Sequence, residues 1–189
     1  LTAAHCIALY QEAIVQGRMR FGLGDNANQP TEKIPVEKGV YPSDPNAGFE
    51  FNFTTYEDDI GLLYLSRAPD VPPAIVHLGK PNWEEMKRTS LIFVGFGYNV
   101  IDGDRVGAGV KREAAWKIDE ETNRTIRWRI DLDEAAQSTC KGDSGGPAFF
   151  ATATELLLVA ITSHGDSGCS QGVNMKADAY LRWLQERII

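Results

Sequence analysis

The chain contains 189 residues, of which 43% are hydrophobic, and this is enough to bury the core of a single domain. Its 26 acidic side chains outnumber its 19 Lys and Arg residues, so the formal net charge at pH 7 is −7. Nucleic acids and anionic membrane surfaces attract clustered Lys and Arg, so this balance argues against both as partners. No apolar run reaches the roughly 20 residues that a membrane-spanning helix requires.

Short strands separated by turns are the pattern expected along the chain. Residues 91–96 and 156–161 are continuous apolar runs bounded by turn-forming residues, which is typical of buried strands. Residues 125–131 alternate between apolar and polar side chains, which predicts a half-buried strand. Near the end of the chain, apolar residues recur at helical spacing and predict one amphipathic helix over residues 176–189. The mixed charges of this helix favour docking on a sheet over binding to a membrane surface.

The segment 140–147, with the sequence CKGDSGGP, is the most informative motif of the chain. Acyl transfer needs a serine whose proton a base can take, and backbone N–H groups that face the developing oxyanion. Glycines beside Ser144 supply the turn and the open approach. His5, in the sequence LTAAHC, is the candidate base. Asp59, in the sequence DDIGLL, is the candidate acid that orients the base.

The order of these residues along the chain separates two folds that could use such a serine. In the Gly-x-Ser-x-Gly elbow of α/β-hydrolases, the acid and then the histidine follow the serine. Here only His164 follows Ser144, and it lies 20 residues on, which is too few for the strands and helices of that fold. The order His5, Asp59, Ser144, with these flanking sequences, resembles the chymotrypsin or trypsin-like serine peptidases.

This resemblance runs from Leu1 to the C-terminal helix and implies an all-β fold of two antiparallel, six-stranded-type β-barrels followed by an α-helix. The active site would lie in the cleft between the barrels. Residues 1–75 would form the remainder of barrel one, residues 76–175 barrel two, and residues 176–189 the helix. The Pro-rich and charged stretch 67–88 contains the expected boundary, and barrel one is expected to be incomplete because its first strands are missing.

The resemblance also implies the roles of individual residues. Ser144 would be the nucleophile, and the N–H groups of Gly142 and Ser144 would form the oxyanion hole. Asp59 is selected over Asp58 because the family's acid directly precedes Ile, a small residue and Leu-Leu. Asp58 is then expected to be a solvated carboxylate at a strand end. Ser163 resembles the serine that supports the buried acid, although an ordinary strand hydroxyl is the alternative.

Substrate specificity in the resembled family is set by a pocket beside the nucleophile. Its floor would be Ser138, six residues before the nucleophile, and its walls would be Gly165 and Gly172. His164 takes the place of a tryptophan and is expected at the pocket edge, in contact with substrate. These residues predict an open, neutral pocket that favours large apolar or aromatic side chains. The nearby Asp166 leaves open the alternative of a preference for Lys or Arg.

Three cysteines bear on the environment of the protein. The resemblance implies a disulfide between Cys140 and Cys169 that flanks the specificity pocket. Cys6 would ordinarily pair with an upstream cysteine, so it is either an orphan of truncation or a free buried thiol. Either state favours an oxidising setting, and the protein is expected to be secreted or periplasmic.

Activation in this family depends on the aspartate before the serine, here Asp143, which pairs with the amine of a newly cut N-terminus. Leu1 lies too close to His5 along the chain to supply that amine. An N-terminal fragment or propeptide is therefore an expected partner, and residues 1–189 alone are expected to be inactive or zymogen-like. The substrate would be a protein or peptide.

The expected chemistry needs no cofactor and no metal. The segment 21–41 resembles a calcium-binding loop only weakly, and a plain surface loop is favoured because its carboxylates are badly spaced. A catalytically silent homologue that only binds is a second function class. An esterase or amidase acting on small molecules is a third.

Overall fold

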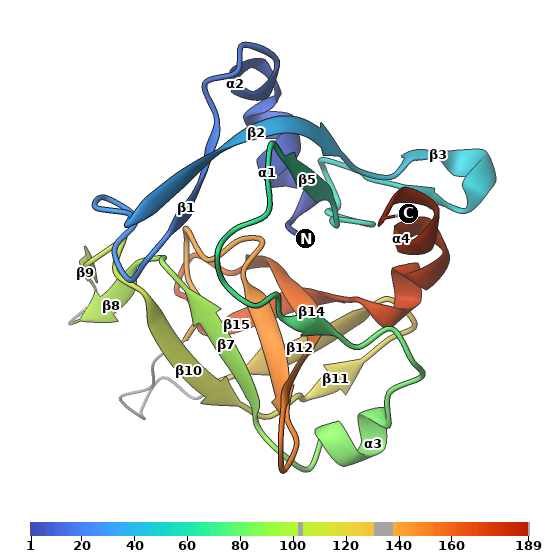
Figure 1. Ribbon diagram of the computed structural model, residues 1–189. Helices are drawn as coiled ribbons and strands as arrows, with labels where there is room; N and C mark the ends of the chain where they lie inside the picture. Colours follow the sequence, from blue (N-terminus) through green and yellow to red (C-terminus); the bar gives the residue numbers. More distant parts are fainter. Residues whose placement is uncertain (102–103, 131–137, 189) are drawn as a thin grey trace.

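The computed structural model describes residues 1–101, 104–130 and 138–188, and most of its regular structure is β-strand, as expected (Figure 1). The chain opens with two short helices, α1 (Ala4–Leu9) and α2 (Gln11–Val15). Strands β1 (Arg20–Leu23), β2 (Glu32–Val40) and β5 (Leu62–Leu65) then form an antiparallel sheet in the order β1-β2-β5. The segment 21–41, expected to be a surface loop, is mainly a β-hairpin in which β1 pairs with the first part of β2.

A small hairpin projects from this N-terminal part of the molecule. It consists of β3 (Ser43–Asp44) and β4 (Phe49–Glu50), joined by the short helix η1 (Pro45–Ala47). Beneath the sheet, Ile7 and Ile14 from the two helices pack against Val36 of β2. This small apolar cluster attaches the helices that carry the start of the chain to the N-terminal sheet.

A larger sheet occupies the second half of the chain and curls around its own core (Figure 1). Its strands follow the order β10-β7-β13-β14-β15-β12-β11, all antiparallel, and β6 pairs in parallel with β14. Their bounds are β6 Ile75–Val76, β7 Leu91–Gly95, β10 Arg112–Trp116, β11 Glu120–Glu121, β12 Thr125–Arg129, β13 Pro147–Ala151, β14 Leu156–Gly165 and β15 Gln171–Lys176. The separate hairpin β8 (Asn99–Ile101) and β9 (Asp104–Val106) lies at one side, and α3 (Trp83–Met86) precedes β7.

The three predicted strands are confirmed as β7, β12 and β14. In β12 the alternating pattern buries Ile126 and Trp128 and leaves Arg127 and Arg129 exposed. Residue 131, the last of that predicted segment, lies outside the described residues. β14 is longer than the apolar run and extends to Gly165, which brings Ser163 and His164 onto the strand.

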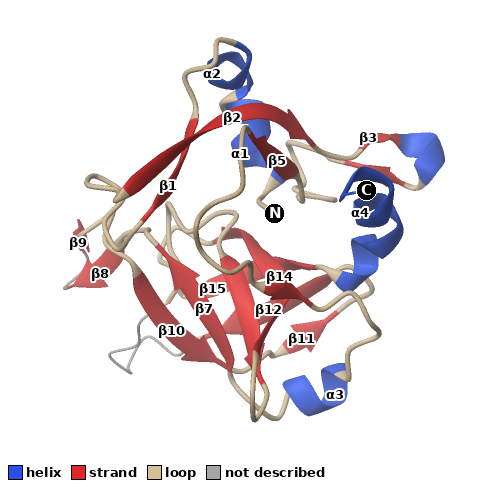
Figure 2. Ribbon diagram, viewed as in Figure 1, coloured by secondary structure: helices blue, strands red, loops and turns tan. Residues whose placement is uncertain are grey.

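The predicted C-terminal helix begins later than its apolar spacing suggested. Lys176 ends strand β15, a single turn η2 (Asp178–Tyr180) follows, and helix α4 covers Leu181–Ile188. Lys176 pairs with Ala160 of β14, and this sheet pairing extends the strand into the segment expected to be helical. Residue 189 lies outside the described residues. Figure 2 shows α1 next to strand β2, while α3 and α4 lie beside the large sheet.

The C-terminal helix joins the two halves of the molecule. Trp183 and Leu184 pack in one cluster with Ile60 and Leu62, which come from the N-terminal half. The hydroxyl of Tyr64 in β5 also donates to the backbone carbonyl of Arg187, at 2.6 Å. In the described part of the chain, no helix has the length and apolar character needed to cross a membrane.

Candidate active site

The base and the acid predicted from sequence lie in direct contact. The ring nitrogen Nδ1 of His5 is 2.7 Å from Oδ2 of Asp59, and the backbone N–H of His5 donates to Oδ1 of Asp59 at 2.8 Å. A two-way backbone bridge between Thr2 and Gly61 aligns the two segments on either side of this pair. A Cβ atom at Gly61 would lie 2.5 Å from Cδ1 of Ile7 and 3.0 Å from the backbone carbonyl of Val40, so a glycine suits the close approach of the segments here.

Asp59 is fully buried, and its carboxylate accepts three hydrogen bonds. The third comes from the hydroxyl of Ser163 on β14, at 2.5 Å. Burial by itself lowers the pKa of His5, but hydrogen bonds with Asp59 and Cys6 outweigh it and raise that pKa above its ordinary 6.5. This arrangement holds the imidazole in one orientation, with Nδ1 next to Asp59 and Nε2 next to the thiol of Cys6.

Ser144 lies close to this pair but is not hydrogen-bonded to it. Its hydroxyl donates to the backbone carbonyl of Ser163 at 3.3 Å, while Nε2 of His5 is 3.5 Å from the thiol of Cys6. Within the described residues, no hydrogen bond joins the Ser144 hydroxyl to His5. Such bonds are often long in ligand-free enzymes and tighten when substrate binds.

The turn around Ser144 presents two backbone amides. Gly142 has a φ of +99° and Gly145 a φ of +79°, and residues other than glycine rarely adopt backbone conformations with such positive φ angles. The N–H of Gly145 donates to the carbonyl of Thr162 at 2.7 Å, which ties the turn to β14. Among the described residues, no hydrogen bond is recorded from the N–H groups of Gly142 and Ser144, the two candidate donors to an oxyanion.

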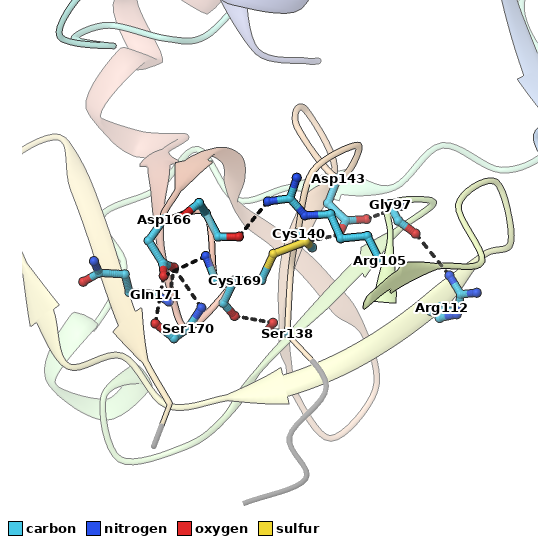
Figure 3. The surroundings of a disulfide bond; sticks show 12 residues. Gly97, Arg105, Arg112, Ser138, Cys140, Asp143, Asp166, Cys169, Ser170 and Gln171 are labelled. Atoms are coloured by element: carbon cyan, nitrogen blue, oxygen red, sulfur yellow. Dashed lines mark hydrogen bonds between the residues drawn. A yellow bond between two sulfur atoms is a disulfide. The ribbon is translucent and has the colours of Figure 1, made fainter. Parts of the chain in front are cut away.

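Asp143 is buried, and Figure 3 shows its carboxylate beside the backbone of Gly97. Its two oxygens accept hydrogen bonds from the N–H groups of Gly97 and Cys140, each at 2.7 Å. Arg112 lies on the other side of the Gly97 peptide and donates to the carbonyl of Gly97 at 3.1 Å. Burial raises the pKa of Asp143, although the two hydrogen bonds and the charge of Arg112 oppose that rise. Local groups therefore satisfy this carboxylate.

The disulfide expected from the resemblance is present between Cys140 and Cys169, whose Cα atoms are 5.1 Å apart. It lies beside a cavity of about 310 Å³ that borders Ser144. Ser163, His164 and Gly165 line this cavity, as does Arg105 of β9.

Ser138 and Gly172, both expected in the specificity pocket, lie next to residues that line this cavity. The hydroxyl of Ser138 donates to the carbonyl of Cys169 at 2.5 Å, and Ser138 borders a hollow that also contacts Asp143. Gly172 pairs with Gly165 and borders a neighbouring hollow, which shares His164, Gly165 and Asp166 with the cavity beside Ser144. A Cβ atom at Gly172 would lie 2.5 Å from the indole ring of Trp128.

Asp166 also lines the cavity, but its carboxylate is fully occupied by its own loop. It accepts hydrogen bonds from the backbone N–H groups of Gly168, Ser170 and Gln171 and from the hydroxyl of Ser170 (Figure 3). Burial raises the pKa of Asp166, but these bonds outweigh it and lower that pKa. The carboxylate is thus a structural acceptor in the loop, and its hydrogen bonds compete with any cationic substrate group.

His164 and Tyr56 form an aromatic wall next to the base. The ring centroids of these two residues are 4.9 Å apart, and Tyr56 also meets the edge of the His5 ring at 5.4 Å. Nδ1 of His164 is 3.0 Å from the hydroxyl of Ser163, and burial lowers the pKa of His164. Sequence reasoning missed Tyr56, whose left-handed backbone (φ +57°) turns its ring toward the site.

Asp58 corrects a further expectation, because it is not a solvated carboxylate. Its side chain is only 4% exposed, and it forms an ion pair with Arg124. Sequence patterns give little indication of this ion pair, because Arg124 lies 66 residues from Asp58 along the chain.

Comparisons with known proteins identify a family that matches most of the chain. A family model described as Trypsin matches residues 1–184. The chain is 26% identical to the phenoloxidase-activating enzyme of Bombyx mori over 190 aligned residues, which cover 87% of the chain and 42% of that protein. It is 24% identical to kallikrein 1-related peptidase b3 of Mus musculus, where the alignment covers 98% of the chain and 75% of the relative. The chain thus spans less than half the length of the silkworm protein.

Proposed function

Because the chain belongs to the trypsin family, we propose that this serine-protease-like protein is an endopeptidase that cleaves peptide bonds through an acyl-enzyme on Ser144. The observation that carries the proposal is the fully buried Asp59, which accepts hydrogen bonds from His5 and Ser163. A buried carboxylate with this set of donors holds the imidazole in one tautomer and stabilises its protonated form.

The proposed reaction has two halves, and in each half His5 acts first as a general base and then as a general acid. His5 takes the proton of the Ser144 hydroxyl as its oxygen attacks the peptide carbonyl. The N–H groups of Gly142 and Ser144 stabilise the oxyanion of the tetrahedral intermediate. His5 then protonates the leaving amine, and water repeats the sequence on the acyl-enzyme. Asp59 stays ionised throughout.

The proposed substrate carries a large apolar or aromatic side chain before the scissile bond. Two features of the cavity support this proposal. The carboxylate of Asp166 already accepts four hydrogen bonds within its own loop. A Lys or Arg side chain entering the cavity would also meet the guanidinium of Arg105. A buried cation without a partner is costly, so apolar residues are favoured.

Asp143 is the proposed activation residue. Its present partners are backbone amides, and an amine supplied by an N-terminal fragment or propeptide would compete with them as a charged donor. The intramolecular disulfide between Cys140 and Cys169 supports a secreted or periplasmic location.

A catalytically silent homologue that binds peptides is the second candidate function. The observation in its favour is the Ser144 hydroxyl, which is bonded to the Ser163 carbonyl and not to His5. In that case the cavity beside Ser144 would hold a peptide without cleaving it.

Reaction with a fluorophosphonate probe distinguishes the two functions, because the probe labels only a serine that a base activates. We expect the full-length, processed protein to be labelled and to hydrolyse chromogenic peptides, and we expect Ser144→Ala to lose the label together with nearly all hydrolysis. Ser66→Ala, outside the site, is the matched control and should retain both. Hydrolysis that survives in Ser144→Ala would refute the endopeptidase mechanism. Peptide binding without labelling would favour the silent homologue.

A further inference from the structure

Asp58, the residue before the candidate acid, is held in a costly conformation and environment. Its φ is +54°, in the left-handed region that aspartate adopts only occasionally, and its carboxylate is buried. Backbone strain and a buried charge persist in a folded protein only when surrounding contacts enforce them. The contacts of Asp58 therefore need an explanation of their own.

Three donors surround the Asp58 carboxylate. Oδ1 accepts from Nη1 of Arg124 at 2.6 Å and from the hydroxyl of Tyr180 at 2.9 Å, while Oδ2 accepts from the backbone N–H of Glu50 at 2.9 Å. Tyr180 is fully buried, and burial together with the neighbouring charge of Asp58 raises its pKa, so its hydroxyl remains a donor. We refer to Asp58, Arg124 and Tyr180 as the Asp58 cluster.

The Asp58 cluster joins three separate parts of the molecule. Arg124 lies between β11 and β12 of the large sheet, and Tyr180 belongs to η2 before the C-terminal helix. Arg124 also donates to the carbonyl of Gly48 at 2.9 Å and lies over the ring of Phe49, which contacts Tyr180. The segment that carries Asp58 is thereby attached both to the large sheet and to the C-terminal segment.

This attachment lies one residue from the group that orients the base. The Asp58 carbonyl accepts from the N–H of Ile60 at 2.8 Å, so a tight turn encloses Asp59. The Asp59 side chain has little freedom of its own, because it must meet both His5 and Ser163. A displacement of about 1 Å in a catalytic group can reduce a rate by about 100-fold, so the backbone at this position matters for the chemistry.

We propose that Asp58 is a positioning residue: Arg124 and Tyr180 hold its ionised carboxylate, and this fixes the backbone from which Asp59 reaches His5. The expected effect of Asp58 on the rate rests on the proposed function, because it assumes that Asp59 orients a catalytic base. Its structural consequence, an altered contact between Asp59 and His5, does not depend on catalysis.

The alternative is that the Asp58 cluster only stabilises the fold, and another ion pair of the chain provides the comparison. Nζ of Lys176 is 2.6 Å from Oε1 of Glu121, and both side chains are largely buried at 5% and 21% exposure. This pair has the same separation as the pair of Asp58 with Arg124, and it has no hydrogen bond to His5, Asp59 or Ser144 in the described residues. Glu121→Gln is therefore a matched control for losing a carboxylate charge.

The experiment compares Asp58→Asn, Arg124→Gln, their double variant and Glu121→Gln in the complete protein. Asparagine tolerates the left-handed backbone, so Asp58→Asn removes the charge without imposing a new turn. We expect Asp58→Asn and Arg124→Gln each to lower kcat about tenfold with KM unchanged within about twofold, and the double variant to be no worse than the poorer single variant. Glu121→Gln should lower Tm and leave kcat unchanged.

Titration of His5 by NMR supplies a readout that needs no activity. The pKa of His5 is raised by Asp59, so a weakened contact should lower it in Asp58→Asn but not in Glu121→Gln. The other groups near the ring, Cys6 and Tyr56, are the same in all variants. If Asp58→Asn lowers Tm like the control but leaves both kcat and the His5 pKa unchanged, the positioning role is wrong. If the parent protein is inactive, the proposed function fails, and the His5 titration alone decides the role of Asp58.

Discussion

Replacing Asp59 by asparagine tests the orientation of the base most directly. The backbone N–H of His5 can only donate, so the amide oxygen of the new side chain would occupy the position of Oδ1. The amide nitrogen would then take the position of Oδ2 and face Nδ1 of His5 and the hydroxyl of Ser163. The serine hydroxyl can rotate to accept, but the imidazole can accept only by moving its proton to Nε2. His5 would then be unable to take the proton of Ser144.

We expect Asp59→Asn to reduce kcat by about 10⁴-fold, the size of effect known for this change in a Ser-His-Asp triad. At 1.36 kcal/mol per tenfold change in rate, this corresponds to about 5.5 kcal/mol of lost transition-state stabilisation. The assay is steady-state hydrolysis of a chromogenic peptide, with thermal unfolding to confirm that the variant folds. Glu121→Gln, which alters a carboxylate outside the site, should retain full activity. A loss of less than tenfold in a folded Asp59→Asn variant would show that Asp59 does not orient the base.

Three further predictions concern pH, the disulfide and the substrate. Burial lowers the pKa of His5, but its hydrogen bonds outweigh burial and raise that pKa above 6.5. Because the base must be neutral to act, kcat/KM should rise with pH, and the midpoint of that rise should lie above pH 6.5. A midpoint below pH 6.5 would contradict this prediction. The disulfide between Cys140 and Cys169 closes a loop with a sequence separation of 29, and replacing both cysteines by serine should lower the free energy of unfolding by about 3.5 kcal/mol. Urea denaturation measures this change. A loss below about 1 kcal/mol would contradict the argument from chain entropy. Peptides with Phe, Tyr or Leu before the scissile bond should be cleaved faster than those with Arg, and the reverse order would refute the proposed preference for apolar side chains.

Strand positions could be predicted because their signals are local. The alternation in β12 and the apolar runs of β7 and β14 reflect which face of each strand is buried, and that periodicity is written in consecutive residues. The start of the C-terminal helix could not be predicted in the same way. Ala177 and Tyr180 have helical spacing, but a single 3₁₀ turn satisfies that spacing as well, and pairing of β15 with β14 takes up Lys176.

The sequence motifs, through their resemblance to the trypsin-like peptidases, identify His5, Asp59, Ser144 and Ser163 as candidates. The structure brings these four residues together. The pocket residues were harder to place. Whether Ser138 and Gly172 border the same cavity as Ser144 depends on how the hydroxyl of Ser138 and the indole of Trp128 are packed, and no local pattern encodes that packing.

By itself, the sequence determined the strand pattern, the family resemblance and the residues that can carry acyl transfer. Only the tertiary structure decided the surroundings of the two carboxylates beside the candidate triad. Asp58 resembles a surface residue in sequence, yet it is buried against Arg124 and Tyr180, which lie 66 and 122 residues away. Asp143 finds its partners in the backbone of Gly97 and Cys140. Burial and ion pairing depend on which distant segments come into contact when the sheets and the C-terminal helix pack. The spacing of residues along the chain does not predict those contacts.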